Sequence, residues 1–353
     1  MLRKNVTHTL LAILINLLAL AGCNSNNPVA TVSDDGSKAF VLNSISNSIS
    51  VINLDSLIVQ NDVIELGANS SAVGFSVRGN RALVPNGIAN NALLIDLDNL
   101  SVIGTIDLPV GSGATGSAFL DDNTAFVCNL NLASVVRIDL RSMSVTDTID
   151  VGQVPGAVAV ANGKVFVVNA NIDLITFQSI GNGTISVIDP VASKVTKTID
   201  TGATNSQFVS LDNEGDLIVV NTGQYGAANG SISVIDPDSE TLTAGPFTIG
   251  DGPGEIGINS VGVAYIASFS AGLYSFDATT NTVLRNAGNA LAALTSGGKN
   301  YGAAGMDFDD NGNIYSVNFG DAATPGTVFV FDANETLVDS VKVGIGPFSI
   351  VIP

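Results

Sequence analysis

The stretch TISVIDP, residues 184–190, returns as SISVIDP at residues 231–237, 47 positions further along the chain. A fixed period of this size is typical of proteins built by repeating one small structural unit. Related apolar segments end in an acidic or amide residue at seven positions: Asn53, Asp96, Asp139, Asp189, Asp236, Asp277 and Asp332. A second apolar segment precedes each of these and ends at Asn43, Asn86, Asn129, Asn169, Asn221, Ser268 or Asn318. Seven units therefore cover the chain from about residue 28 to its C-terminus.

Each unit contains four short segments with strand character, which we name A to D. In the fourth unit they are 156–162, 164–169, 184–189 and 194–200. Segments B and C carry apolar residues on both alternating faces, which predicts strands covered on both sides. Segment D alternates apolar residues with Thr and Lys, as expected of an outer edge. Four-stranded antiparallel sheets that cover one another, repeated seven times, predict an all-β fold, a seven-bladed β-propeller.

Two segments compete to complete the first blade. Residues 29–36 and residues 348–353 both have the pattern of an A strand, and only one of them is needed. The sequence leaves this choice open.

The repeat resembles the YVTN family of β-propellers. The family pattern combines an apolar strand ending in Asn, a strand with the sequence S-V-I-D, and a V-G-x-x-P turn. Here VFVVN (165–169), TISVID (184–189) and VGQVP (151–155) match it, while Ser268 and Asn53 depart from it. The resemblance covers nearly all of residues 28–353 and implies the fold, but it implies no particular activity, because such folds support unrelated functions.

The N-terminus has the features of an export signal. Arg3 and Lys4 precede a short apolar run at 10–20, which is too short to span a bilayer as a stable helix. The run ends in LAGC, residues 20–23, which resembles a bacterial lipobox. That resemblance implies cleavage before Cys23 and lipidation of its thiol and amine, although an ordinary signal or anchor helix with an incidental cysteine is the alternative.

These features predict three segments. Residues 1–22 form a lipoprotein signal peptide, residues 23–27 a lipidated N-terminus with a short linker, and residues 28–353 the propeller. Lipid chains would then be the only attachment to a membrane. Asn24 takes the place of the Asp that retains lipoproteins at the inner membrane. The resemblance therefore implies the cell envelope, and the outer membrane if the organism is Gram-negative.

Composition limits the partners of this chain. It has 13 Lys and Arg against 32 Asp and Glu, a formal net charge of −19 and no basic run, which excludes nucleic acid as a partner. Removal of residues 1–22 would also remove His8, the only histidine. Cys128 would be the only free thiol, at a strand B position where we expect a buried, inert side chain.

The residues that end segments B and C recur in nearly every unit, which favours a structural role. An Asn at the end of a strand can hydrogen-bond to the backbone of a neighbouring loop, and an Asp can close an Asx-turn.

Four insertions interrupt the repeat. From the end of B to the end of C, units four, five and seven need 20, 15 and 14 residues, against 9 or 10 in the others. The connection from unit six to unit seven is also longer by about nine residues. Because strands alternate in direction, B–C loops and D–A connections share one face of a propeller. All four insertions are therefore predicted on that face, on adjacent blades.

The insertions supply aromatic, amide and charged side chains on loops held by a rigid fold, which is typical of binding sites. The candidate binding residues are Phe177, Gln178, Gln224, Tyr225, Lys299, Asn300, Tyr301, Phe319 and Asp321. The predicted partner is a small molecule, a glycan or an envelope or surface protein. Loop variation without function is the alternative.

One stretch has the opening pattern of a calcium loop. Asp307, Asp309, Asn311 and Gly312 spell D-x-D-x-N-G, and we name the first three as candidate calcium ligands. Position twelve of the loop is Asn318 and not the bidentate Glu of such loops. The same residues also suit an ordinary A–B hairpin.

Catalysis has little support in the sequence. Without His8 there is no triad, imidazole base or His-ligated metal, and we predict a non-catalytic, monomeric protein without a cofactor. The alternative is a cation-dependent hydrolase similar to propeller lactonases, which needs carboxylates in the central channel. Glu255 and Asp307 are the acidic exceptions among the A segments.

Overall fold

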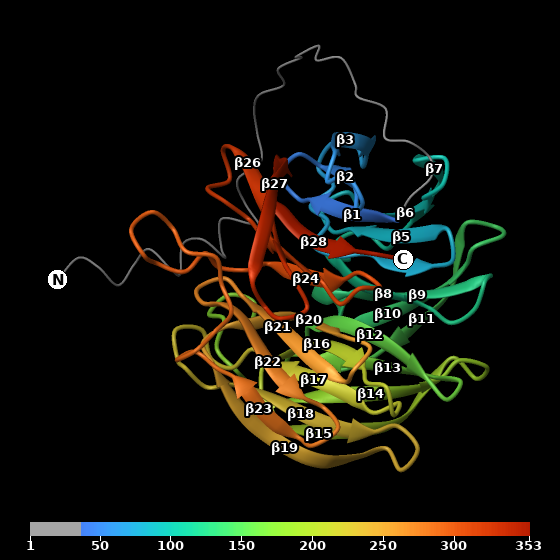
Figure 1. The fold of residues 1–353 in the computed structure, drawn as a ribbon. Helices are drawn as coiled ribbons and strands as arrows, with labels where there is room; N and C mark the ends of the chain where they lie inside the picture. The colour runs from blue at the N-terminus through green and yellow to red at the C-terminus, as the bar shows by residue number, and fades with distance from the viewer. Residues whose placement is uncertain (1–36) are drawn as a thin grey trace.

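The computed structural model describes residues 37–353, and these form seven four-stranded antiparallel sheets in a ring. This confirms the all-β, seven-bladed propeller. Along the chain, colour runs once around the ring in Figure 1, so that red β28 lies beside blue β1. One short 3-10 helix, η1 (Leu130–Leu132), lies between two strands of blade 3.

The strands follow the order A, B, C, D within each blade. Blade 1 contains β28 (Pro347–Val351), β1 (Lys38–Asn43), β2 (Ser48–Asn53) and β3 (Val59–Glu65). Blade 2 contains β4 (Ser76–Arg78), β5 (Arg81–Asn86), β6 (Asn91–Asp96) and β7 (Ser101–Asp107). Blade 3 contains β8 (Ala114–Phe119), β9 (Thr124–Asn129), β10 (Ser134–Asp139) and β11 (Ser144–Asp150).

The remaining four blades repeat this arrangement. Blade 4 contains β12 (Pro155–Ala161), β13 (Lys164–Asn169), β14 (Asn182–Asp189) and β15 (Lys194–Thr204). Blade 5 contains β16 (Ser206–Leu211), β17 (Leu217–Asn221), β18 (Gly230–Asp236) and β19 (Thr241–Gly250). Blade 6 contains β20 (Pro253–Ile258), β21 (Val263–Ser268), β22 (Gly272–Asp277) and β23 (Thr282–Arg285). Blade 7 contains β24 (Gly305–Phe308), β25 (Ile314–Asn318), β26 (Pro325–Phe331) and β27 (Leu337–Ile345).

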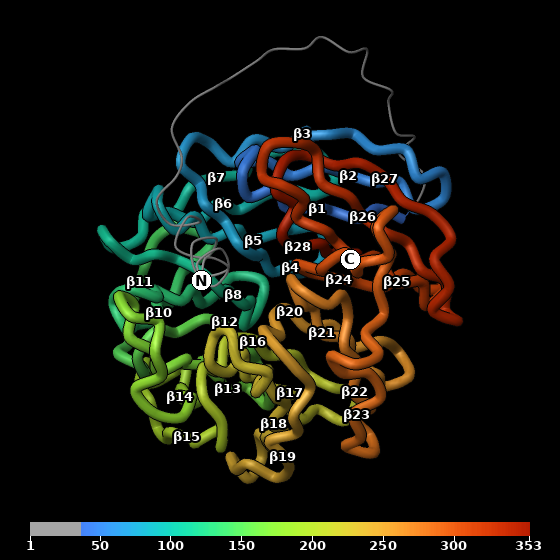
Figure 2. The backbone as a smooth tube through the Cα atoms, turned by 90° about the vertical axis from the view of Figure 1, so that its left-hand side faces the viewer, coloured from blue at the N-terminus to red at the C-terminus, as the bar shows by residue number. Residues whose placement is uncertain are grey.

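The C-terminal strand closes the ring. β28 pairs antiparallel with β1, with Val41 opposite Ile350 and Leu42 opposite Ser349. This settles the choice between the two terminal segments, because residues 348–353 supply the A strand of blade 1. Residues 29–36 lie outside the described residues. Figure 2 shows the molecule along the axis of the ring, with the A strands arranged around its centre.

The core lies between blades. In β13 every residue after Lys164 is buried, whereas β11 alternates exposed and partly buried residues. Phe166 and Val187 of blade 4 pack in one cluster with Leu217 and Val219 of blade 5. Each blade therefore buries its faces against its neighbours, which is what the apolar B and C segments require.

The repeated Asn, Ser and Gly of the sequence form one hydrogen-bonded unit. In blade 4 the Asn169 amide donates to Ser186 Oγ at 3.1 Å, and Ser186 Oγ also accepts from the backbone N–H of Gly152 at 3.4 Å. A side chain at Gly152 would collide with Asn169. The turn glycine, the strand B Asn and the strand C Ser therefore depend on one another.

The expected partner of these Asn residues needs correction in most blades. Asn43 donates to Ser50 Oγ at 2.8 Å and Asn221 to Ser233 Oγ at 2.8 Å, so the partner is a strand C hydroxyl and not loop backbone. The reason is that both strands pair in register and bring the two side chains onto one face. Asn318 keeps the expected backbone contact, with Gly302 O at 2.7 Å.

Blade 6 departs from the Asn pattern and compensates for it. Ser268 stands at the Asn position, and Tyr274 stands where Ser186 stands in blade 4. Tyr274 is fully buried, and its hydroxyl donates to Asp251 O at 3.0 Å. A larger side chain thus fills the space that Asn occupies elsewhere.

The Asx-turn prediction is confirmed. Asp189 Oδ1 accepts the backbone N–H of Val191 at 2.8 Å and of Ala192 at 3.0 Å, and Asn53 Oδ1 accepts that of Ser56 at 2.9 Å. These hydrogen bonds hold the pKa of Asp189 below its usual range. Such residues close the C–D turns and are structural.

Cys128 is a free, fully buried thiol on β9, as predicted. Burial raises the pKa of its thiol, which keeps it protonated and unreactive.

The predicted signal peptide 1–22, the predicted lipidation of Cys23 and the predicted linker 23–27 lie outside the described residues. Among residues 37–353, no helix has the length and apolar character needed to cross a bilayer.

Candidate ligand-binding site

The A strands surround a central cavity of about 190 Å³, and residues from six blades line it. Its lining comes from around the middle of five A strands and, in blade 2, from residues 73–75, which precede β4. The cavity therefore lies near the middle of the channel and extends toward the D–A connection of blade 2.

Seven equivalent positions form one level of this channel, each opposite the penultimate residue of strand B in its own blade. Their occupants are Gly74, Gly116, Ala157, Phe208, Glu255, Gly305 and Ser349. Five of these residues are small, which leaves room at the centre. Glu255 is the only charged one.

Glu255 lies on β20 and turns its carboxyl toward the neighbouring A strands. Oε1 accepts a hydrogen bond from Ser349 Oγ of β28 at 2.7 Å. Oε2 is buried and has no hydrogen-bond partner among residues 37–353. A side chain at Gly305 of β24 would collide with Oε2, so this glycine makes space for the carboxyl.

Burial raises the pKa of Glu255 to about 8. The Ser349 hydrogen bond opposes this rise, and the nearby Asp307 carboxylate adds to it. Glu255 as a whole residue is partly exposed, while its free oxygen is buried. The group is therefore a neutral acid at neutral pH unless a positive charge is placed beside it.

Asp307 on β24 is held by backbone. Its oxygens accept the N–H of Phe308 at 2.9 Å and of Ile352 at 2.7 Å. Burial raises its pKa to about 6, against the effect of these two hydrogen bonds.

The candidate calcium ligands lie in the hairpin between β24 and β25. Asp309 accepts the backbone N–H of Asn311 and of Asn313, both at 2.9 Å, and also the Asn313 amide at 2.7 Å. Asn311 is exposed. Among residues 37–353 no group of three or more His, Cys, Asp or Glu is placed to hold a metal ion. These contacts are those of a hairpin, and calcium at Asp307, Asp309 and Asn311 stays a prediction.

The four insertions occupy the positions that the spacing indicated. They lie between β13 and β14, β17 and β18, β25 and β26, and β23 and β24. The first three are B–C loops and the last is a D–A connection, so all lie on one face of blades 4 to 7.

The insertions of blades 4 and 5 contact each other. The Phe177 and Tyr225 rings meet edge to face, with centroids 6.4 Å apart. Gln224 Nε2 donates to Gln178 Oε1 at 2.7 Å. The structure therefore brings four of the nine candidate residues into one group.

That group contacts an A strand through Gln207. Gln207 follows the first residue of β16, and its amide donates to the Tyr225 hydroxyl at 2.7 Å. The corresponding residue is Gly in blades 4 and 6, namely Gly156 and Gly254. Gln207 is not among the residues predicted from the sequence, although a Gln at this position departs from the Gly of blades 4 and 6.

Phe319 of blade 7 contacts an A strand of blade 1. Its ring contacts Phe348, the second residue of β28, with centroids 6.4 Å apart. Phe269 of the blade 6 B–C loop contacts both rings, at 6.3 Å and 5.7 Å. Phe269 and Phe348 were also missed, because contacts between blades cannot be counted along one repeat.

The remaining candidate residues lie further from the channel. Tyr301 is 37% exposed and packs on Phe329 of β26, with centroids 5.0 Å apart. Asn300 donates to Ala271 O at 2.9 Å, and Lys299 is exposed. Asp321 closes an Asx-turn by accepting the N–H of Thr324 at 2.9 Å. Tyr301 packs on Phe329, whereas Tyr225 contacts Phe177 and Gln207, so the two tyrosines have different partners.

No protein-family model and no curated protein sequence matches the chain. A functionally unknown protein from Desulfotomaculum acetoxidans is similar with a TM-score of 0.66 at 16% identity, covering 90% of this chain and 99% of that chain. Hydrazine synthase from Kuenenia stuttgartiensis is similar with a TM-score of 0.64 at 16% identity, over 80% and 90%. Streptogramin B lyase gives 0.63 at 15% identity, over 80% and 87%.

At these identities the similarity shows the propeller fold alone. The similar structures include enzymes and a protein of unknown function, so the fold does not select an activity. Membership of the YVTN family stays a prediction.

Proposed function

We propose that this protein is a non-catalytic, lipid-tethered propeller of the cell envelope that binds a small molecule at the mouth of its central channel. One observation carries the proposal. Insertions from two separate parts of the ring contact A strands, through Tyr225 with Gln207 and through Phe319 with Phe348. Because the A strands surround the channel, we infer that these insertions border its mouth on the face of the D–A connections.

The predicted lipid anchor fits this orientation. β1 begins at Lys38, and a B strand begins on the face of the A–B turns, opposite the insertions. The segment from Cys23 to Lys38 reaches at most about 50 Å when extended. Lipidation at Cys23 would therefore leave the inserted face directed away from the membrane and open to ligands, with the outer membrane as the expected location.

A protein partner is the second candidate. The blade 4 insertion exposes Leu174, Ile175 and Ile180, and Ile175 is 89% exposed. Apolar side chains gathered on one loop are typical of an interaction surface. A glycan is a further candidate. It would extend from the channel mouth to Tyr301.

The alternative of a cation-dependent hydrolase depends on Glu255 and Asp307. They lie on neighbouring A strands, but both Asp307 oxygens accept backbone N–H groups and the described residues include no metal-binding cluster. These contacts favour binding over catalysis.

Alanine variants at the channel mouth test the proposal. A small-molecule library would be screened by thermal shift against the full-length protein, and ligands would be compared on Tyr225→Ala, Phe319→Ala and Tyr301→Ala. A ligand at 100 times its Kd stabilises the native state by about 2.7 kcal/mol. We expect Tyr225→Ala and Phe319→Ala to weaken binding at least about tenfold, because each removes an aromatic surface at the mouth.

Tyr301→Ala separates the candidates. A small ligand should bind this variant normally, whereas a glycan or a protein partner should bind it more weakly. Ligands that bind all three variants as tightly as the unmodified protein would overturn the proposal.

A further inference from the structure

The residues that line the central cavity include both aromatic residues and glycines. Phe75 and Phe208 contribute aromatic rings, and Gly74, Gly116 and Gly156 contribute backbone without side chains. Its volume of about 190 Å³ equals that of roughly six water molecules. The cavity is therefore suited to a molecule of a few heavy atoms.

Glu255 is the only charged side chain in this lining. Its equivalents in blades 4 and 1 are Ala157 and Ser349, so the fold does not need a carboxyl at this level. A buried acceptor without a partner is unfavourable, because it has lost its hydrogen bonds to water. A group that donates hydrogen bonds to the carboxyl would recover part of that cost.

Resting on the proposed function, we propose that this cavity takes a small organic cation, specifically a primary alkylammonium ion, with Glu255 as its counter-ion. The ammonium group donates to the Glu255 carboxylate and to Ser349 Oγ. The alkyl part lies against Phe75 and Phe208, whose ring faces attract positive charge.

The charge of the whole molecule favours the same ligand. A formal net charge of −19 raises the local concentration of cations near the channel. A calcium ion prefers six to eight oxygen ligands, whereas an ammonium group needs only a few acceptors. Asp307 is the other titratable group that acts on Glu255, and its oxygens already accept backbone N–H groups.

Binding should be coupled to proton release. Glu255 has a pKa of about 8 in the empty site, so it is mostly protonated at pH 6 and must ionise to hold a cation. An alkylammonium ion keeps its charge to about pH 10, as a lysine side chain does. Affinity should therefore rise about tenfold from pH 6 to pH 7 and level off near pH 8 to 9.

Isothermal titration calorimetry with n-propylammonium chloride on the full-length protein tests this inference. Titrations at pH 6.5 in two buffers of different ionisation enthalpy should show about one proton released per ion bound. Glu255→Gln should lose at least about tenfold in affinity. Glu65→Gln is the matched control, because Glu65 is exposed on β3 and the change in net charge is the same.

Three results would overturn the inference: equal binding to Glu255→Gln, binding of propanol as tight as that of propylammonium, or binding of calcium chloride in place of propylammonium. The measurement of proton release uses the unmodified protein, so it remains decisive if Glu255→Gln fails to fold.

The two proposals fail separately. If library ligands depend on Tyr225 and Phe319 but no alkylammonium ion binds, the binding function stands and only the ligand class is wrong. If binding of propylammonium depends on Glu255 but on neither aromatic residue, the cavity is a binding site and the channel mouth is not.

Discussion

At the scale of the residue, the residues that recur in the repeat contact one another within one blade. Asn169 donates to Ser186 and to Thr184 Oγ1, and Gly152 passes close to the Asn169 side chain. Packing explains why Asn, Ser and Gly recur, because each of the three residue types is needed for the other two. These residues therefore do not indicate a ligand.

Asn169→Ala should destabilise the protein by about 1–3 kcal/mol, because it removes the shorter of the two hydrogen bonds that the buried Ser186 hydroxyl accepts and leaves only the longer one from Gly152. Urea unfolding followed by circular dichroism would measure the change. Asn334→Ala is the control, since Asn334 lies in an exposed turn and should change stability by less than about 0.5 kcal/mol. Equal effects of the two substitutions would contradict the structural role of Asn169.

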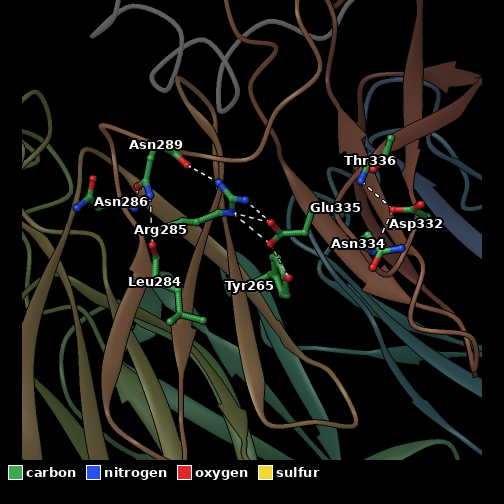
Figure 3. A network of polar contacts seen from close by, with 9 residues as sticks. All are labelled: Tyr265, Leu284, Arg285, Asn286, Asn289, Asp332, Asn334, Glu335 and Thr336. Carbon is green, nitrogen blue, oxygen red and sulfur yellow. Dashed lines mark hydrogen bonds and ion pairs between the residues drawn. The ribbon is translucent and has the colours of Figure 1, made fainter.

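At the scale of the element, one polar network joins blade 6 to blade 7. Arg285 of β23 forms an ion pair with Glu335 in the turn between β26 and β27, and Glu335 accepts the hydroxyl of Tyr265 at 2.8 Å (Figure 3). Arg285 also donates to Asn289 O at 2.9 Å, which fixes the start of the 286–304 insertion (Figure 3). The network thus connects the blade interface to a loop of the candidate site.

Glu335→Gln should cost about 1 kcal/mol at pH 7, because it removes one charge of a partly buried pair. The hydrogen bond from Arg285 holds the pKa of Glu335 below its ordinary value. Its contribution is therefore fully present above the pKa of the unfolded chain, about 4.3, and is lost as pH falls through the lower folded pKa.

Unfolding free energies of the unmodified and Glu335→Gln proteins should converge below about pH 4. The exposed Glu65→Gln variant, which changes net charge equally, should show no such pH-dependent difference. A constant difference at every pH would mean that the side chain acts through packing and not through its charge.

At the scale of the whole molecule, a single strand closes the ring. β28 pairs with β1, and Ile350 is buried in one cluster with Val41 of β1 and Val317 of blade 7. The last strand therefore holds the first and seventh blades together. A ring without it would have an open edge at β1.

Deletion of residues 347–353 should remove on the order of 5 kcal/mol, a large part of the stability of a typical domain, and cause self-association through the edge of β1. Urea unfolding and size-exclusion chromatography would report the two effects. Deletion of the exposed Pro353 alone should change neither. A truncated protein that stays monomeric with an unchanged midpoint would show that closure contributes little.

The sequence by itself determined the seven units, the strand order within each blade and the face that carries the insertions. These follow from local patterns, since strand alternation and spacing are set along the chain. It also indicated Glu255 and Asp307 as exceptions among the A segments.

Only the tertiary structure decided which terminus closes the ring and which candidate residues meet. Tyr225 and Phe319 contact residues of A strands, while Tyr301 packs on Phe329, although all three lie on insertions of the same face. The free oxygen of Glu255 depends on Gly305 and Ser349, which belong to two other blades. These two contacts of Glu255 join residues 50 and 94 positions apart, at distances fixed by the ring and by no local pattern.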